Sequence, residues 1–320
     1  MLNTKTAVSA MACVMGLMVG SVQAQSQTGE QAPAYDASVP TPTLAEVPYG
    51  EHERHVLDFW QAESNKPTPL VFVIHGGAWK GGSKERLSSF VDTEALLQAG
   101  ISVVAINYRL MKHADEVVPP VKAPLHDAAR ALQFVRSKAK EWNIDKARIG
   151  VAGGSAGACS SLWLAYHDDL ADTASKDPIA RESTRLYCAS VIGPQTSLDP
   201  EQMKQWIPLI TYGGHAFGKG NFAQFLADRE EILPWIKEYS PYALVSAGDT
   251  PVSVFYNKAP GIDEVKGAAT HSAHFGVGLQ ERCREVGIAC DVVYPGAEDV
   301  KYETPTSYLI ATLKAPAGVK

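Results

Sequence analysis

A serine between glycines, set between a short apolar run and a run of small residues, constrains this chain more than any other feature. Residues 148–152 read RIGVA and predict a buried strand, whereas residues 156–165 read AGACSSLWLA and predict a helix. Ser155 lies between them, with Gly153 and Gly157 on either side. In this setting G-x-S-x-G predicts a sharp turn that raises the serine Oγ above a sheet, at a helix N-terminus. Bulkier residues than glycine would clash in so tight a turn, and Ser155 is the candidate nucleophile.

Short apolar runs alternate with amphipathic segments along the chain. Strands are expected over 55–61, 70–74, 101–108, 148–152, 186–192, 251–256 and 288–294, and helices over 87–98, 124–142, 156–165, 273–286 and 306–313. Gly100 and Gly287 stand where two of these helices should end. The alternation predicts an α/β fold with a mostly parallel central sheet and helices on both faces. Residues 199–250 are rich in aromatics without a strand pattern, which predicts an insertion long enough to cap a site.

The first residues predict an export signal. Lys5 precedes an apolar run over 7–22, and small residues then lead to Ala24, so a signal peptide over 1–24 is expected to be cut after Ala24. The run is short for a membrane span and lacks a charged stop, so no stable membrane anchor is expected. The protein is therefore predicted to be secreted or periplasmic. Residues 25–45 are rich in Gln, Ser, Thr and Pro and predict a flexible leader, followed by one domain over 46–320.

Four cysteines remain after the predicted cleavage. They are Cys159, Cys188, Cys283 and Cys290. An even number in an oxidising compartment permits disulfides, either between Cys283 and Cys290 or between Cys159 and Cys188. Small buried thiols are the alternative for each pair.

Several classes of partner are not expected. The formal net charge is −6 and no basic cluster occurs, so the sequence gives no sign of nucleic-acid binding. It also lacks H-E-x-x-H, paired C-x-x-C and the glycine patterns of nucleotide-binding loops. Neither a metal nor a cofactor is therefore expected.

Backbone donors for a developing oxyanion are found in the string HGGAW, directly after the second predicted strand. Glycine lets backbone N–H groups turn toward the serine. The N–H of Gly77, together with that of Gly76 or Ala78 and that of Ala156 after the nucleophile, predicts an oxyanion hole. His75 at the start of the string is expected to hold this loop rather than act as a base.

The general base is harder to place. In this arrangement the histidine normally follows the last strand, but no histidine follows the predicted strand over 288–294. The nearest candidates are His271 and His274, at the end of a loop that starts at the carboxyl end of the strand over 251–256. His271 is predicted to be the base because it lies in the loop rather than in the following helix. His274 is the alternative.

The orienting acid is expected in the same loop. Asp263 is predicted to fill this role, with Glu264 and Asp199 as alternatives. His215 in the insertion is expected to be structural, and a place in the substrate pocket is its alternative.

Four motifs occur in a fixed order, namely HGGAW, YRL, P-x-x-D-A and GGSAG. With them the chain resembles the α/β-hydrolase superfamily, and within it the exported carboxylesterase branch of feruloyl, acetyl-xylan and hormone-sensitive-lipase-like enzymes. The resemblance covers about residues 60–300. It implies Ser155 as the nucleophile, with oxyanion positions at Gly76, Gly77 and Ala156. The sequence departs from the family pattern in the histidine missing after the last strand.

The expected activity is that of an exported serine hydrolase that cleaves carboxylic esters through an acyl-enzyme, with a small-molecule or carbohydrate ester as its partner. The aromatic insertion predicts a pocket of limited size and hence short acyl groups. Acetyl or feruloyl groups on polysaccharides are expected by analogy with the family alone. The unusual position of the histidine suggests a second hypothesis, a catalytically silent binding protein. An amidase or peptidase, such as a formamidase, is the third.

Overall fold

The computed structural model describes residues 1, 34–113, 116–261 and 269–316. From residue 34 onward, the described residues belong to one compact unit. Apart from residue 1, the predicted signal peptide lies outside the described residues, as does the predicted leader up to residue 33.

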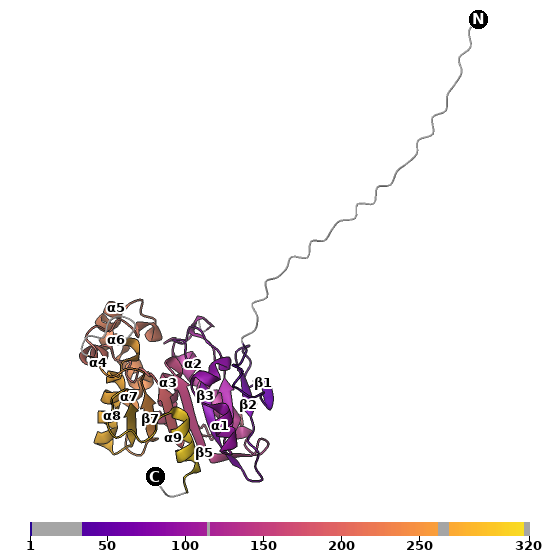
Figure 1. Ribbon diagram of the computed structural model, residues 1–320. Helices are drawn as coiled ribbons and strands as arrows, with labels where there is room; N and C mark the ends of the chain where they lie inside the picture. Colours follow the sequence, from indigo (N-terminus) through magenta and orange to yellow (C-terminus); the bar gives the residue numbers. More distant parts are fainter. Residues whose placement is uncertain (2–33, 114–115, 262–268, 317–320) are drawn as a thin grey trace. The chain divides into compact units, whose positions relative to one another are not determined.

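One sheet forms the centre of this unit (Figure 1), and its strand order is β1-β2-β4-β3-β5-β6-β7-β8 in the described chain. The strands are β1 (Leu44–Pro48), β2 (Val56–Trp60), β3 (Thr68–Ile74), β4 (Ser102–Ile106), β5 (Ile144–Gly154), β6 (Cys188–Ile192), β7 (Val252–Phe255) and β8 (Cys290–Val293). The pairs β1–β2 and β2–β4 are antiparallel. The other neighbouring pairs are parallel. The predicted mostly parallel sheet is confirmed.

Helices connect these strands. The α-helices are α1 (Thr93–Gln98), α2 (Lys122–Ser137), α3 (Ala156–Tyr166), α4 (Pro200–Trp206), α5 (Phe222–Ala227), α6 (Arg229–Tyr239), α7 (Pro241–Leu244), α8 (His274–Val286) and α9 (Pro305–Lys314). The 3₁₀ helices are η1 (Lys84–Ser89), η2 (Met111–His113), η3 (Gly214–Phe217) and η4 (Ala269–His271). Among the described residues, no helix combines the length and the apolar character that crossing a membrane requires.

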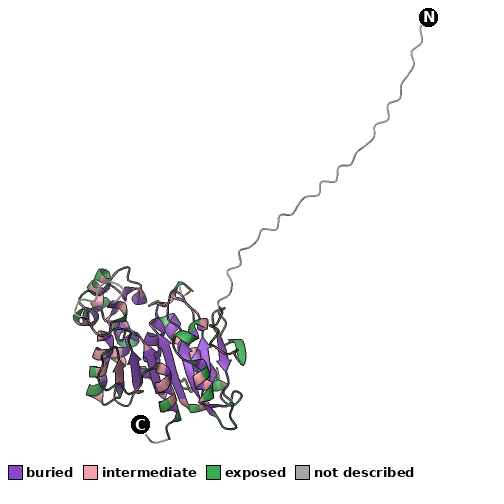
Figure 2. Cartoon of the chain, viewed as in Figure 1, coloured by how far each residue is buried: buried purple, intermediate pink, exposed green. Residues whose placement is uncertain are grey.

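Both faces of the sheet are buried. In β3, Leu70, Phe72 and Ile74 pack into a larger core with α2, α3 and α8, whereas Val71 and Val73 pack into a smaller core with α1 and α9. Successive side chains of a strand point to opposite faces, so a strand covered on both sides must be apolar throughout. Figure 2 accordingly shows the central strands as buried along their length.

The segment expected to form one helix over 87–98 is divided in two. The 3₁₀ helix η1 ends at Ser89, and α1 starts only at Thr93. Asp92 adopts an extended conformation between them, and its carboxylate accepts a hydrogen bond from the N–H of Ala95 at 2.9 Å. The prediction of a continuous helix is wrong because this aspartate starts a new helix.

The predicted flexible leader is wrong for residues 34–45. The Tyr35 hydroxyl donates a hydrogen bond to Asp58 at 2.7 Å, and its ring packs edge-on against Trp60 with centroids 5.1 Å apart. Trp60 Nε1 donates to the Pro40 carbonyl at 2.7 Å. One tyrosine and one proline carbonyl thus attach this segment to β2, and a polar composition does not reveal such contacts.

All four cysteines after residue 33 are free thiols in buried positions. Burial raises the pKa of the Cys159 and Cys188 thiols above its ordinary value. In the structure the four cysteines are therefore small buried thiols, the alternative to the two disulfides that the sequence permitted.

Candidate active site

Ser155 occupies the sharp turn between β5 and α3. Its backbone has φ 53° and ψ −120°, a conformation that costs a non-glycine residue about 1–3 kcal/mol. The N–H of Ser155 donates to the Ile192 carbonyl at 2.9 Å, and the Ser155 carbonyl accepts from Cys159 N at 2.9 Å. The end of β6 and the first turn of α3 therefore hold the strained residue in place.

The flanking glycines let the turn approach the neighbouring strand β3. A Cβ on Gly157 would lie 2.1 Å from the Ile74 carbonyl oxygen, and one on Gly153 would lie 2.6 Å from the same oxygen. Neither distance is sterically allowed. The predicted need for glycine thus has its cause in close contact with the backbone of β3.

The HGG loop after β3 lies against the serine. A Cβ on Gly76 would lie 2.6 Å from the Gly154 carbonyl oxygen and 3.3 Å from Ser155 Cβ. Gly77 has φ 116°, which favours glycine. Within the described residues, the N–H groups of Gly76, Gly77 and Ala156 donate no hydrogen bond to a protein atom. These donors are available for an oxyanion, and their role stays a prediction.

His75 holds the HGG loop from inside the fold. Its Nδ1 donates to the Gly76 carbonyl at 2.7 Å, and its ring stacks on Tyr108 with centroids 4.2 Å apart. Arg54 Nη2 lies 3.3 Å from His75 Nε2 and donates to the Gly82 carbonyl at 2.8 Å. Burial lowers the pKa of His75 to about 3, so the ring stays neutral and serves as a structural element of the loop.

The motifs YRL and P-x-x-D-A meet each other away from the serine. Arg109 Nη2 lies 2.7 Å from Asp127 Oδ1, and the Arg109 N–H donates to Asp127 Oδ2 at 2.9 Å. Neither residue lines the cavity that contains Ser155. Both motifs fix the end of β4 against α2.

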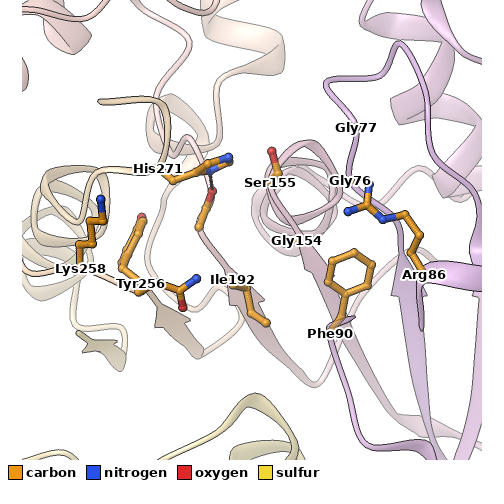
Figure 3. Close-up of a pocket in the computed structure, with 12 residues that line it drawn as sticks. Gly76, Gly77, Arg86, Phe90, Gly154, Ser155, Ile192, Tyr256, Lys258 and His271 are labelled. Atoms are coloured by element: carbon orange, nitrogen blue, oxygen red, sulfur yellow. Dashed lines mark hydrogen bonds between the residues drawn. The ribbon is translucent and has the colours of Figure 1, made fainter. Parts of the chain in front are cut away.

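His271 shares a cavity of about 540 Å³ with Ser155. Its imidazole points toward Ser155 from the end of η4 (Figure 3). Nδ1 lies 2.8 Å from the Gly193 carbonyl oxygen. A carbonyl only accepts, so Nδ1 carries the proton and Nε2 keeps the lone pair that a general base needs. The described residues show no hydrogen bond between His271 Nε2 and Ser155 Oγ, so the role of His271 as the base stays a prediction that the shared cavity supports.

His274 is not at this cavity. It is the first residue of α8, and its Nε2 lies 3.0 Å from the Gly261 carbonyl oxygen. It does not line the cavity with Ser155. The structure therefore brings His271, and not His274, to the serine.

The predicted acid cannot be located in this structure, because Asp263 and its alternative Glu264 lie outside the described residues. The other alternative, Asp199, accepts a hydrogen bond from Glu201 N as the N-cap of α4 and pairs with Arg229 at 2.7 Å. It neither lines the cavity nor bonds His271. Among the described residues, the Gly193 carbonyl is the group that orients His271.

Sequence reasoning missed Gly193 and Gln195, which surround the Nδ1 side of His271. Gly193 has φ 57°, and a Cβ there would lie 3.1 Å from His271 Nδ1. Gln195 is buried, with its Nε2 3.3 Å from Nδ1 and hydrogen-bonded to the Thr270 carbonyl. The sequence signal was Gly193 itself, directly after the predicted strand over 186–192. A glycine there does not by itself indicate that its carbonyl accepts a hydrogen bond from a histidine.

The insertion over 199–250 does not cap the cavity as expected, since none of its residues is among those lining it. Its aromatic rings pack on one another instead; Phe217 lies 5.9 Å from Trp235 and 6.0 Å from Phe225 between ring centroids. His215 lies 4.7 Å from Tyr212, and burial lowers its pKa to about 4. It is structural, and the argument for a small pocket from these aromatics fails.

A second cavity of about 530 Å³ adjoins the first at Ile192, Tyr256 and Asn257. Tyr294 and Pro295, at the end of β8, line it. The residues after β8 thus line the second cavity, whereas His271 belongs to η4, which precedes β8 in the chain. No group of three His, Cys, Asp or Glu suited to a metal ion occurs in the described part of the chain.

A family model described as BD-FAE matches residues 57–264, which is more than half of the 320 residues. The chain belongs to the BD-FAE family. The matched stretch contains the HGG loop and Ser155, whereas His271 lies beyond its end. The predicted membership of the esterase branch of the α/β hydrolases is confirmed.

The curated relatives match this BD-FAE protein only over part of their length. A kynurenine formamidase of Debaryomyces hansenii is 34% identical over 134 residues, which cover 40% of this chain and 41% of that protein. Esterase LipC of Mycobacterium tuberculosis is 30% identical over 115 residues, or 35% of this chain and 27% of LipC. The chain thus spans less than half the length of these relatives.

Solved structures show the same fold at low identity. A truncated carbohydrate esterase from gut microbiota superposes with a TM-score of 0.59 and 19% identity, covering 82% of this chain and 90% of that one. A thermophilic esterase of Thermogutta terrifontis has a TM-score of 0.58 and 21% identity, covering 78% and 80%. The predicted α/β-hydrolase fold is confirmed.

Proposed function

We propose that this BD-FAE protein is a serine hydrolase that cleaves carboxylic esters through an acyl-enzyme. The observation that carries the proposal is a serine in a strained turn that shares a cavity with an imidazole whose Nδ1 is bonded to a backbone carbonyl. This bond directs the basic lone pair to Nε2, as activation of a serine hydroxyl requires. The matches to two esterases of Mycobacterium tuberculosis and one of Caenorhabditis elegans support the same reaction class.

The reaction follows from the positions of these groups. Ser155 Oγ attacks the ester carbonyl carbon while its proton passes to His271 Nε2, and the N–H groups of Gly77 and Ala156 receive the oxyanion. The bond to the alcohol oxygen then breaks, and the alcohol leaves with the proton from His271. Water next attacks the acyl-enzyme and gives a proton to His271, which returns a proton to Ser155 as the acid departs.

The acyl group is proposed to be small or planar, such as acetyl or feruloyl on a polysaccharide. A cavity of about 540 Å³ is within the usual range for small-molecule sites and accommodates either group. This choice is made by analogy with the family, because the aromatic insertion gives no size limit.

Formamide hydrolysis is the second candidate. The matches to kynurenine formamidases of Debaryomyces hansenii and Danio rerio favour it, at 34% and 42% identity over the aligned segments. The same serine and imidazole perform both reactions, which differ in the leaving group. Comparing kcat/KM for an aryl acetate and an aryl formamide decides between them.

Replacement of the nucleophile tests the proposal. Ser155→Ala should reduce para-nitrophenyl acetate hydrolysis to the background rate, because no other described serine or threonine lines the cavity. The hydroxyl of Tyr256, which also lines it, donates to the Pro194 carbonyl at 3.1 Å. Ser137→Ala, at the exposed end of α2, is the matched control and should keep full activity. A fluorophosphonate probe should label the wild type and not the Ser155→Ala protein. Wild-type protein that neither turns over the ester nor takes the label would instead be a binding protein.

Export is proposed on the sequence of residues 1–24 alone. Mass spectrometry of the protein from the periplasm or the medium of a bacterial host should find a chain that begins at Gln25. An intact N-terminus on cytoplasmic protein would contradict it.

A further inference from the structure

The cavity around Ser155 carries positive charge that no described acid neutralises. Of its lining residues, Arg86 and Lys258 are cationic, and none is Asp or Glu. The whole chain has a formal net charge of −6, so this lining is opposite in sign to the protein average. A cleft lined by charges of one sign concentrates ligands of the other sign.

Arg86 is placed to contact a substrate. It belongs to η1 and is exposed. Figure 3 shows its side chain reaching past Phe90 toward Gly76, on the opposite side of Ser155 from His271. The guanidinium thus lies on the same side of the nucleophile as the HGG loop.

The acidic side chains near Arg86 form ion pairs with Lys84 instead. Lys84, two residues before Arg86, forms ion pairs with Asp58 at 3.0 Å and Glu85 at 2.7 Å, and a further one with Glu46. The Arg86 guanidinium forms neither an ion pair nor a hydrogen bond with any described residue. Its charge therefore has no structural partner in this part of the chain and remains available to a ligand.

We propose that Arg86 binds a carboxylate, or an equally compact anionic group, on the acyl or the alcohol part of the substrate. The proposal rests on the ester hydrolysis proposed above. A guanidinium presents two parallel N–H donors that match the two oxygens of a carboxylate. Lys258 lines the same cavity beyond His271 and adds to the attraction without a defined geometry (Figure 3).

Two matched substrate pairs test this binding. The first compares mono-para-nitrophenyl succinate with para-nitrophenyl levulinate, in which a ketone replaces the acyl-side carboxylate. The second compares para-acetoxybenzoate with para-acetoxybenzamide, for an anion on the alcohol side. The measured quantity is the ratio of kcat/KM for the anionic ester to that for its neutral partner.

Wild-type protein should prefer the anionic member of at least one pair. Arg86→Gln should lower that ratio by roughly tenfold, the size expected for a charge-assisted hydrogen bond in a partly exposed site, and Arg86→Lys should restore part of it. Arg284→Gln, which removes an exposed charge of α8 outside the cavity, is the control and should leave the ratio unchanged. Added salt should lower the wild-type ratio through screening, which tests the proposal without a variant.

The outcomes separate the two proposals. If the wild type hydrolyses the neutral esters but shows no salt-sensitive preference in either pair, Arg86 does not bind an anion and the proposed hydrolase activity stands. The same conclusion follows if Arg86→Gln and Arg284→Gln change the ratio equally. If the wild type hydrolyses none of the four esters, the failure lies in the proposed hydrolase activity itself.

Discussion

At the scale of single residues, a backbone carbonyl orients His271 in the described part of the chain, and the role of Asp263 stays a prediction. The Gly193 carbonyl lies 2.8 Å from His271 Nδ1 and fixes the tautomer of the ring. A carbonyl carries only a partial charge, so it orients the imidazole but stabilises the imidazolium less than a carboxylate does. This position favours glycine, since a Cβ would lie 3.1 Å from Nδ1 on a backbone with φ 57°.

Substitution of the two histidines separates their roles. His271→Gln should lower kcat/KM for para-nitrophenyl acetate by roughly 10²–10⁴-fold, because a general base typically contributes that much. His274→Gln should leave the rate largely unchanged, since this ring contacts the Gly261 carbonyl and does not line the cavity. The measurement is steady-state kinetics on both variants after circular dichroism has shown that they are folded. The reverse result would make His274 the base.

At the scale of elements, the proposed base belongs to η4, between β7 and α8, whereas in the family pattern it follows the last strand. β7 is parallel to β6 and β8, so its carboxyl end lies at the same edge as that of β8. A loop from either strand therefore approaches Ser155 from neighbouring directions. A histidine in either loop could therefore face Ser155 with the same arrangement of strands.

Asp199 is a structural residue of the helical insertion. It caps α4 and pairs with Arg229 at the start of α6. Asp199→Asn should lower the free energy of unfolding by about 1 kcal/mol, because it weakens a partly exposed ion pair and keeps a side chain that can cap a helix. Ester hydrolysis should be retained. Urea unfolding and the same kinetic assay measure the two effects, and a loss of activity without a loss of stability would return Asp199 to the list of candidate acids.

At the scale of the whole molecule, parallel strands bring distant segments together. Gly76, Ser155 and Gly193 follow the carboxyl ends of β3, β5 and β6, and these ends meet at one edge of the sheet. Ligand sites in open parallel sheets form at this edge. The same packing buries His75 in neutral form below the site.

Buried neutral histidines make the stability of the fold dependent on pH. In the unfolded chain His75 takes up a proton below its ordinary pKa of 6.5, whereas in the fold it does so only near pH 3. Protons therefore favour unfolding, and the free energy of unfolding should fall by up to about 1.4 kcal/mol per pH unit for such a group as the pH drops below about 6.5. His215 contributes in the same direction.

Urea unfolding of the wild type and of His75→Gln at a series of pH values between neutral and mildly acidic measures this effect. The variant should be less stable at neutral pH, because it loses the stacking on Tyr108. Its stability should fall less steeply with decreasing pH, since one group no longer gains a proton on unfolding. Parallel curves for the two proteins would show that His75 does not cause the dependence.

The sequence by itself determined the sheet from β2 to β8, the turn that holds Ser155 and the glycines beside it, but not β1, which starts within the segment expected to be a flexible leader. Strands buried on both faces must be apolar throughout, and a turn in close contact with a neighbouring backbone must contain glycine. Both features can therefore be recognised from residue types alone. The elements around Ser155 were predicted correctly for this reason. Strong local constraints of this kind need no knowledge of distant contacts.

Only the tertiary structure decided which imidazole reaches Ser155, what orients it, and which charges line the cavity. His271 and His274 are three residues apart; the position of the predicted helix favoured His271, but only the packing around the cavity shows which ring lines it. Gly193 and Arg86 act through a carbonyl and an unpaired charge, and these properties depend on what lies nearby in space rather than on residue type. The same holds for Tyr35, whose contacts with β2 order a segment that its composition predicts to be flexible.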